Sequence, residues 1–222
     1  MSDILYRWPE AARVGSRVPK EKLYEHGNVS AALREQFVSD IARITWAYKL
    51  AKSTVNLPAT DAVSEIQVFR VDTKAGADVS DQLLTVIDRA ILKPIIFEIR
   101  RETPDRTEVR TVAQFKQQRS NTPQVGHYSG TNWVPEDYER RSLPAAIDLS
   151  ALYVALLEPL TDVRARPGEA MSEVADRLKA ISKLEREIAG LQRKLKNERQ
   201  FNRKVELQRK LKAIQAELEQ QR

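Results

Sequence analysis

The sequence contains no cysteine, only two histidines and only seven glycines among its 222 residues. The absence of cysteine excludes disulfide bonds, thiol catalysis and every zinc or iron–sulfur site that needs thiolate ligands. The glycines do not take the spacing with which a P-loop or a dinucleotide-binding turn surrounds phosphate groups. Two histidines, His26 and His127, cannot form a histidine-rich metal site, and a structural role is favoured for each. We therefore expect no cofactor, while magnesium binding by carboxylates stays open.

Long apolar stretches are also missing. The longest, Ala151–Leu157, is far shorter than the roughly 20 residues that a membrane-spanning helix needs. The N-terminus has no basic segment followed by an apolar run, which is the pattern of a secretory signal. We expect a cytoplasmic protein that does not contact a membrane.

Between residues 30 and 166 the apolar positions follow two different periods. Apolar residues three or four apart predict a helix that begins near Ser30 and ends before Pro58. Four strands and two further helices complete the pattern, with strands at 64–72, 95–100, 107–116 and 125–133, one helix capped by Asp78 or Ser80 and one capped by Asp148. A hairpin interrupts the alternation of strands and helices. The predicted fold class is therefore α+β, with a mixed sheet packed with helices.

The two ends of the chain differ from this middle part. Residues 1–29 contain two prolines and two glycines, so we expect an irregular N-terminal arm, which aromatic residues such as Trp8 anchor to the core. Pro167-Gly168 is the best domain boundary, because only one glycine and no proline follow it. The predicted division is an arm at 1–29, an α+β domain at 30–166 and a coiled-coil tail at 169–222.

Apolar residues of the tail are spaced three and four apart in two stretches, which is the pattern of a coiled-coil seam. The seam residues are Ile181, Leu184, Ile188, Leu191 and Leu195, followed by Leu207, Leu211, Ile214 and Leu218. The gap from Leu195 to Leu207 does not fit the register. A reversal there into an antiparallel hairpin is favoured over one long helix, because folding back lets each short seam bury the other.

Positive charge is concentrated in the same tail. The chain has a net charge of +6, and residues 169–222 hold 14 Lys and Arg against 9 Asp and Glu. The candidate nucleic-acid-binding residues are Arg193, Lys194, Lys196, Arg199, Arg203, Lys204, Arg209, Lys210 and Lys212. Such a stripe can attract a polyanion by Coulomb attraction and counterion release. A solvated helix face has the same composition and is the simpler interpretation.

One alternative is enzymatic. A restriction-type nuclease needs a carboxylate on one strand and Glu-x-Lys on the next strand, which together hold Mg²⁺ and a water molecule. Asp72 ends one expected strand and Glu98 lies on the following one, but Arg100 stands where this chemistry has lysine. Because arginine does not deprotonate in proteins, it cannot help to activate a water molecule. The match to the nuclease pattern is therefore partial.

Several short stretches also carry a family resemblance. They are Tyr6-Arg7-Trp8-Pro9, Val18-Pro19-Lys20, Tyr24-Glu25-His26-Gly27, Ile44-Thr45-Trp46-Ala47-Tyr48-Lys49-Leu50, Glu65-Ile66-Gln67-Val68-Phe69, Lys93-Pro94-Ile95-Ile96-Phe97-Glu98 and the tail segment from Glu198 to Leu207. Together they resemble the bacterial domain-of-unknown-function family 4391 along essentially the whole chain. The resemblance implies a bacterial cytoplasmic protein encoded beside helicases and DNA methyltransferases in phage-defence or restriction-like loci. It transfers no catalytic residues.

Three functional hypotheses follow. The favoured one is a non-catalytic accessory or adaptor subunit of a bacterial anti-phage defence or restriction-like complex. It would bind a helicase or methyltransferase partner, with DNA contact or self-association through the basic tail left open. The alternatives are a Mg²⁺-dependent nuclease that uses Glu98 and a stand-alone nucleic-acid-binding protein.

Overall fold

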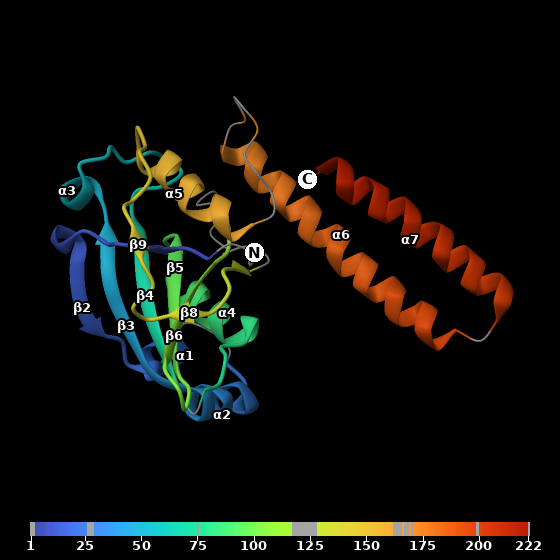
Figure 1. Cartoon of the computed structure of the whole chain (residues 1–222), viewed down its shortest axis with the longest axis horizontal. Coiled ribbons are helices and arrows are strands. Elements are labelled where there is room, and N and C mark those ends of the chain that lie inside the picture. The colour runs from blue at the N-terminus through green and yellow to red at the C-terminus, as the bar shows by residue number, and fades with distance from the viewer. Residues whose placement is uncertain are drawn as a thin grey trace. The chain divides into compact units, whose positions relative to one another are not determined.

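The computed structural model describes residues 3–25, 29–74, 76–116, 128–161, 166, 169, 171–198 and 200–221. His26, His127, Pro167-Gly168 and Arg199, which the sequence analysis singled out, lie outside these residues. The chain divides into two compact units, Met1–Asp162 and Val163–Arg222, whose elements are drawn in Figure 1. The predicted mixed α+β class is confirmed, because a mixed sheet and helices together form the first unit.

The main sheet has seven strands in the order β2-β3-β4-β5-β6-β7, and β8 also pairs with β6. These strands are β2 (Arg13–Arg17), β3 (Ile41–Leu50), β4 (Ile66–Thr73), β5 (Ile95–Glu102), β6 (Thr107–Ala113), β7 (Ser129–Gly130) and β8 (Val134–Pro135). Strands β4 and β5 are parallel, and the other paired neighbours are antiparallel. A separate parallel pair joins β1 (Leu5–Tyr6) to β9 (Arg140–Arg141).

Helices connect and cover these strands. They are α1 (Lys20–Glu25), α2 (Ala31–Asp40), α3 (Lys52–Val55), α4 (Asp81–Ala90) and α5 (Leu149–Leu157), with the short 3₁₀ helices η1 (Glu10–Ala12) and η2 (Glu158–Leu160). The Ser30 hydroxyl accepts a hydrogen bond from the backbone N–H of Leu33, and the Asp148 carboxylate accepts one from that of Ala151. Two of the expected helix caps are therefore formed.

One face of the sheet packs against α1, α2 and α4 and forms the main core. Phe69 and Val71 of β4 and Phe97 and Ile99 of β5 lie in this core. Because successive side chains of a strand point to opposite faces, the residues between them belong to the other face of the sheet. Arg70, Asp72, Glu98 and Arg100 therefore share that second face.

The helix expected from Ser30 to Pro58 is wrong in its second half. Helix α2 ends at Asp40, and Ile41–Leu50 form strand β3 between β2 and β4. Every third residue of β3 is buried, from Ile41 and Ile44 to Ala47 and Leu50. The register of β3 against β4 shifts twice, and each β-bulge inserts an extra residue that resets the alternation. This three-residue period resembles a helix in the sequence.

The N-terminal segment is more regular than expected. Strand β1 pairs with the distant strand β9, and β2 adds an edge to the main sheet. Both pairings join segments far apart in the sequence, so local composition does not reveal them. Of the strand expected at 125–133, residues 125–127 lie outside the described part, and only Ser129–Gly130 form a strand, β7.

The second unit contains α6 (Met171–Asn197) and α7 (Phe201–Gln221). The two helices run antiparallel beside each other in Figure 1, and we call this pair the helical hairpin. The reversal favoured from the sequence is therefore present between Asn197 and Phe201. Among the helices of both units that the structure describes, none combines the length and the apolar composition needed to span a bilayer.

Candidate functional site

The apolar seam holds the helical hairpin together. Ile181, Leu184 and Leu191 of α6 are buried against Ile214 and Leu218 of α7. Three further predicted seam residues pack against this cluster, namely Ile188, Leu207 and Leu211. Leu195, the last predicted seam residue of α6, is half-buried. The seam therefore contributes to one helix pair within one chain.

A salt bridge fixes the open end of the hairpin. The Arg177 guanidinium donates to both carboxylate oxygens of Glu169, at 2.7 and 2.6 Å, and also to the backbone carbonyl of Gln221 at 3.1 Å. The cation thus lies at the C-terminus of α7, where it also interacts favourably with the helix dipole. The hydrogen bonds from Arg177 lower the pKa of Glu169 to about 2 from the usual 4.5.

This ion pair predicts a pH dependence. A carboxylate whose pKa is depressed in the folded state stabilises the fold above its unfolded pKa, and the stabilisation is lost as the pH falls through the folded value. We expect E169Q to lower the thermal midpoint of the hairpin at neutral pH. The difference from the unsubstituted protein should shrink between pH 4.5 and about pH 2. Thermal unfolding followed by far-UV circular dichroism at a series of pH values measures this difference in midpoint.

A matched control for this pH dependence is E217Q on α7, because Glu217 is exposed and carries the same charge. E217Q should leave the midpoint nearly unchanged at every pH. An equal pH-dependent effect of both substitutions would contradict the role of the Arg177–Glu169 pair.

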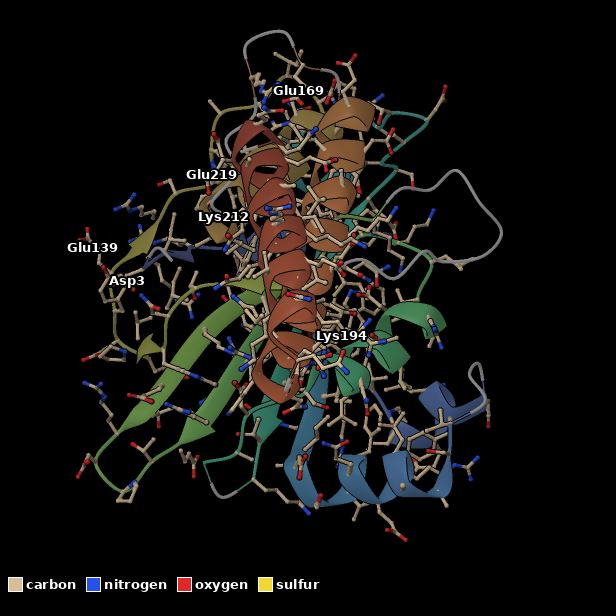
Figure 2. The ribbon with its side chains drawn as sticks, turned by 90° about the vertical axis from the view of Figure 1, so that its right-hand side faces the viewer. Asp3, Glu139, Glu169, Lys194, Lys212 and Glu219 are labelled. Atoms are coloured by element: carbon tan, nitrogen blue, oxygen red, sulfur yellow. The ribbon has the colours of Figure 1, made fainter. Side chains whose placement is uncertain are left out.

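The predicted basic residues gather at the turn of the hairpin. All eight that the structure describes are exposed. Because the chain reverses between α6 and α7, residues 191–212 form the half of the hairpin that contains the turn, with nine Lys and Arg against two Glu in the sequence. Figure 2 shows Lys194 near this end and Glu169 and Glu219 at the opposite end. The charge is therefore polarised along the hairpin.

Four of these cations line a single groove. A pocket of about 580 Å³ lies between the ends of the two helices, bordered by Arg193 and Lys194 of α6 and Arg203 and Lys210 of α7. We call it the basic groove. Asn197, Glu198, Glu206 and Leu207 complete its lining. Lys196, Lys204, Arg209 and Lys212 do not line it. The structure thus divides the predicted stripe into two sets of equal charge.

The two carboxylates of the nuclease hypothesis lie on adjacent strands. In the parallel register, Asp72 of β4 pairs with Arg100 of β5, and Arg70 pairs with Glu98. Asp72 and Glu98 therefore project from the same face of the sheet, two residues apart in register. Both carboxylates are buried, with side-chain exposures of 9% and 1%.

Arginines surround both carboxylates. One oxygen of Glu98 accepts hydrogen bonds from the Trp8 indole N–H at 2.8 Å and from Arg140 at 2.7 Å. The second oxygen lies 3.5 Å from a terminal nitrogen of Arg70. Asp72 accepts a 2.8 Å hydrogen bond from Arg43 and lies 3.8 Å from Arg100.

This arrangement favours a structural role for the two carboxylates. Four guanidinium groups repel a divalent cation and form ion pairs with both carboxylates, although Oδ1 of Asp72 and Oε2 of Glu98 accept no hydrogen bond. No group of three or more potential metal-ligating side chains occurs within the part of the chain that the structure describes. The sequence analysis missed the partners Trp8, Arg43, Arg70 and Arg140. Only Arg70 carried a signal, since it alternates with Asp72 along one strand.

The fold and the surfaces define a mixed α+β protein that carries a basic helical hairpin. Comparison with models of known protein families assigns the chain to one family. Residues 7–218 match the family described as a domain of unknown function (DUF4391), so the chain belongs to this family. Neither a curated protein nor a solved structure matches the chain.

Proposed function

We propose that this protein is a non-catalytic accessory subunit of a bacterial anti-phage defence or restriction-like complex in the cytoplasm. Its basic groove contacts DNA that a helicase or DNA methyltransferase partner holds. The observation that carries the proposal is the convergence of Arg193, Lys194, Arg203 and Lys210 on one groove. Clustered cations release counterions from DNA when they bind its phosphates, which supplies sequence-independent affinity.

The apolar seam supports the same proposal. Its three- and four-residue spacing and its burial between α6 and α7 support an antiparallel coiled coil as part of this proposal. Because the seam is buried within one chain, the hairpin extends the basic end without a second copy. The mass of the purified protein in solution should be that of a monomer. A stable dimer that is lost when seam residues are made polar would contradict this part of the proposal.

Two variants with equal charge loss test the DNA contact. The groove variant R193Q/K194Q/R203Q/K210Q should bind a short DNA duplex at least about tenfold more weakly than the unsubstituted protein. Its salt dependence should also be shallower, by up to about 0.9 per lost phosphate contact in log K against log salt. Fluorescence anisotropy between about 50 and 200 mM salt measures both quantities.

The matched control is K196Q/K204Q/R209Q/K212Q, which removes four charges of the same end from outside the groove. We expect it to weaken binding much less than the groove variant. Equal loss in both variants would mean that net charge alone governs binding, and a flat salt response of the unsubstituted protein would exclude the DNA contact.

The accessory role itself is tested by co-expression with any helicase or DNA methyltransferase that the same locus encodes. Co-purification of one of them with the full chain, and loss of phage resistance when the groove variant replaces the chain, are the expected results. Full resistance with the groove variant, or no association with either enzyme, would overturn the proposal. Resistance that needs neither enzyme would favour the stand-alone nucleic-acid-binding alternative.

The nuclease alternative keeps one observation in its favour, which is that Asp72 and Glu98 share a face of adjacent strands. Incubation of the protein and its partners with plasmid DNA and Mg²⁺ distinguishes the two functions. We expect no cleavage above background. Cleavage that E98Q abolishes would replace the accessory role with an enzymatic one.

A further inference from the structure

A second cationic surface lies in the first unit, on the face of the sheet opposite the main core. The antiparallel register places Arg17 of β2 beside Thr45 of β3, and Thr45 beside Arg70 of β4. Residues directly opposite each other in a ladder project from the same face. Arg43, two residues before Thr45 on β3, shares this face as well. We call Arg17, Arg43 and Arg70 the arginine face.

On this surface the positive charges are exposed and the negative charges are buried. Arg17 is exposed, and the side chains of Arg43 and Arg70 are 58% and 37% exposed. The neighbouring carboxylates of Asp72 and Glu98 are buried. Guanidinium groups therefore meet solvent, and the carboxylates beneath them hold two of the three in place.

The hydrogen-bonding capacity of these arginines is only partly used by the carboxylates. Arg43 binds Asp72 through Nε, so its terminal nitrogens do not form that hydrogen bond. Arg70 is 3.5 Å from Glu98, which is longer than a strong charge-assisted hydrogen bond. A guanidinium has five N–H donors in a planar fork that suits phosphate oxygens.

Acidic residues limit the surface on one side. Arg100 pairs with Glu136 and Glu102, which neutralise the β5 edge of this face. The three exposed guanidinium groups of the arginine face thus lie on β2, β3 and β4. Arg17 and Arg70 are two strands apart, or about 10 Å, which is the axial rise of about three nucleotides in one DNA strand.

We propose that the arginine face binds the phosphodiester backbone of nucleic acid. The surface belongs to the first unit and goes beyond the DNA contact proposed for the hairpin. Phosphate groups would accept hydrogen bonds from the terminal nitrogens of Arg43 and Arg70, and Arg17 would extend the contact along the backbone. Such contacts carry affinity without base specificity.

The test uses the full chain and the same labelled DNA duplex as the hairpin experiment. R17Q/R43Q/R70Q should weaken binding at least about fivefold and reduce the salt slope by up to about three times 0.9. The matched control is K22Q/K52Q/R89Q, which removes three exposed cations from helices α1, α3 and α4. This control should change the affinity less than twofold.

The outcomes separate this inference from the proposed function. If the arginine variant weakens binding and the hairpin groove variant does not, the arginine face stands and the hairpin contact falls. If only the groove variant weakens binding, the arginine face is not a nucleic-acid surface. Equal loss in the arginine variant and its control would likewise overturn the inference. Circular dichroism identifies a variant that fails to fold. R17Q alone then repeats the test, because Arg17 is exposed and the buried carboxylates Asp72 and Glu98 pair with the other two arginines of the face.

Discussion

Replacing Asp88 by alanine should lower the free energy of unfolding of the first unit by about 3–5 kcal/mol, the cost of breaking a buried ion pair. Asp88 and Lys116 are 1% and 3% exposed. One Asp88 oxygen lies 3.4 Å from Lys116 Nζ, and the other accepts hydrogen bonds from Gln114 at 2.5 Å and the Tyr128 hydroxyl at 2.6 Å. The substitution removes the carboxylate that compensates the buried Lys116 ammonium group and that accepts hydrogen bonds from Gln114 and Tyr128.

Urea unfolding followed by tryptophan fluorescence measures this loss. The three tryptophans of the chain, Trp8, Trp46 and Trp133, all lie in the first unit, so their emission reports on that unit and not on the hairpin. The midpoint should fall with an unchanged slope against denaturant concentration. A loss below about 1 kcal/mol would show that water reaches the site and that the pair is not buried in solution.

The converse substitution, K116M, should cost less than D88A. The Asp88 carboxylate keeps its bonds from Gln114 and Tyr128, although α4 loses the ammonium group that bonds the carbonyls of Asp88 and Ile91 at its C-terminal end. The double variant D88A/K116M should cost less than the sum of the two single losses, because each single substitution leaves its partner uncompensated. Strict additivity would mean that the two groups do not interact.

Removing Lys116 also has a pH signature. Burial raises the pKa of Asp88, and the charge of Lys116 opposes that shift. In K116M the opposition is gone, so the folded state takes up a proton at a higher pH than the unfolded state. A raised pKa of an acid gives stability that is present below the unfolded value and lost as the pH rises through the folded value. K116M should therefore become more stable, relative to the unsubstituted protein, as the pH is lowered.

Sequence reasoning identified the parts of the fold in which the apolar residues follow the regular spacing of a strand or a helix. Strands β4, β5 and β6 combine β-branched residues with clear turn signals, and Asp148 caps α5 as expected. Strand β3 was missed because two bulges give its buried residues a helical spacing. Strand β1 was missed because its partner, β9, lies about 135 residues away in the sequence. Pairing of such remote segments is decided by tertiary contacts rather than by local preference.

The candidate surfaces also combine features that local sequence reveals with features that only the tertiary structure determines. The nine basic residues of the tail could be identified from composition, but not which four line a groove. That selection depends on where the helix reverses and on the rotation of α7 against α6. The arginines around Glu98 come from separate strands, and Trp8 comes from the N-terminal segment. No single stretch of sequence contains that cluster. Local sequence therefore does not reveal that Glu98 accepts hydrogen bonds from Trp8 and Arg140 and lies 3.5 Å from Arg70.

Trp8→Ala should destabilise the first unit by about 3–5 kcal/mol, because a buried aromatic ring is lost together with a hydrogen bond. Trp8 is 7% exposed, packs near Tyr6 and Tyr48, and donates its indole N–H to Glu98. Trp8→Phe keeps most of the ring but removes the donor, and it should cost about 1–2 kcal/mol. Urea unfolding followed by the fluorescence of Trp46 and Trp133 measures both values.

Comparison of two Glu98 variants then tests whether Glu98 holds the N-terminal segment against the sheet or serves catalysis. E98Q keeps an oxygen that can accept the Trp8 hydrogen bond but loses the charge that pairs with Arg140 and Arg70, whereas E98A loses both. If Glu98 attaches the N-terminal segment, E98A should be the less stable variant, and its effect should be smaller in a Trp8→Phe background, where the donor is already absent. Additive effects of E98A and Trp8→Phe, combined with full stability of E98Q, would mean that burial of Glu98 serves no structural purpose. That result would favour a functional reason for keeping the buried carboxylate, and with it the nuclease hypothesis.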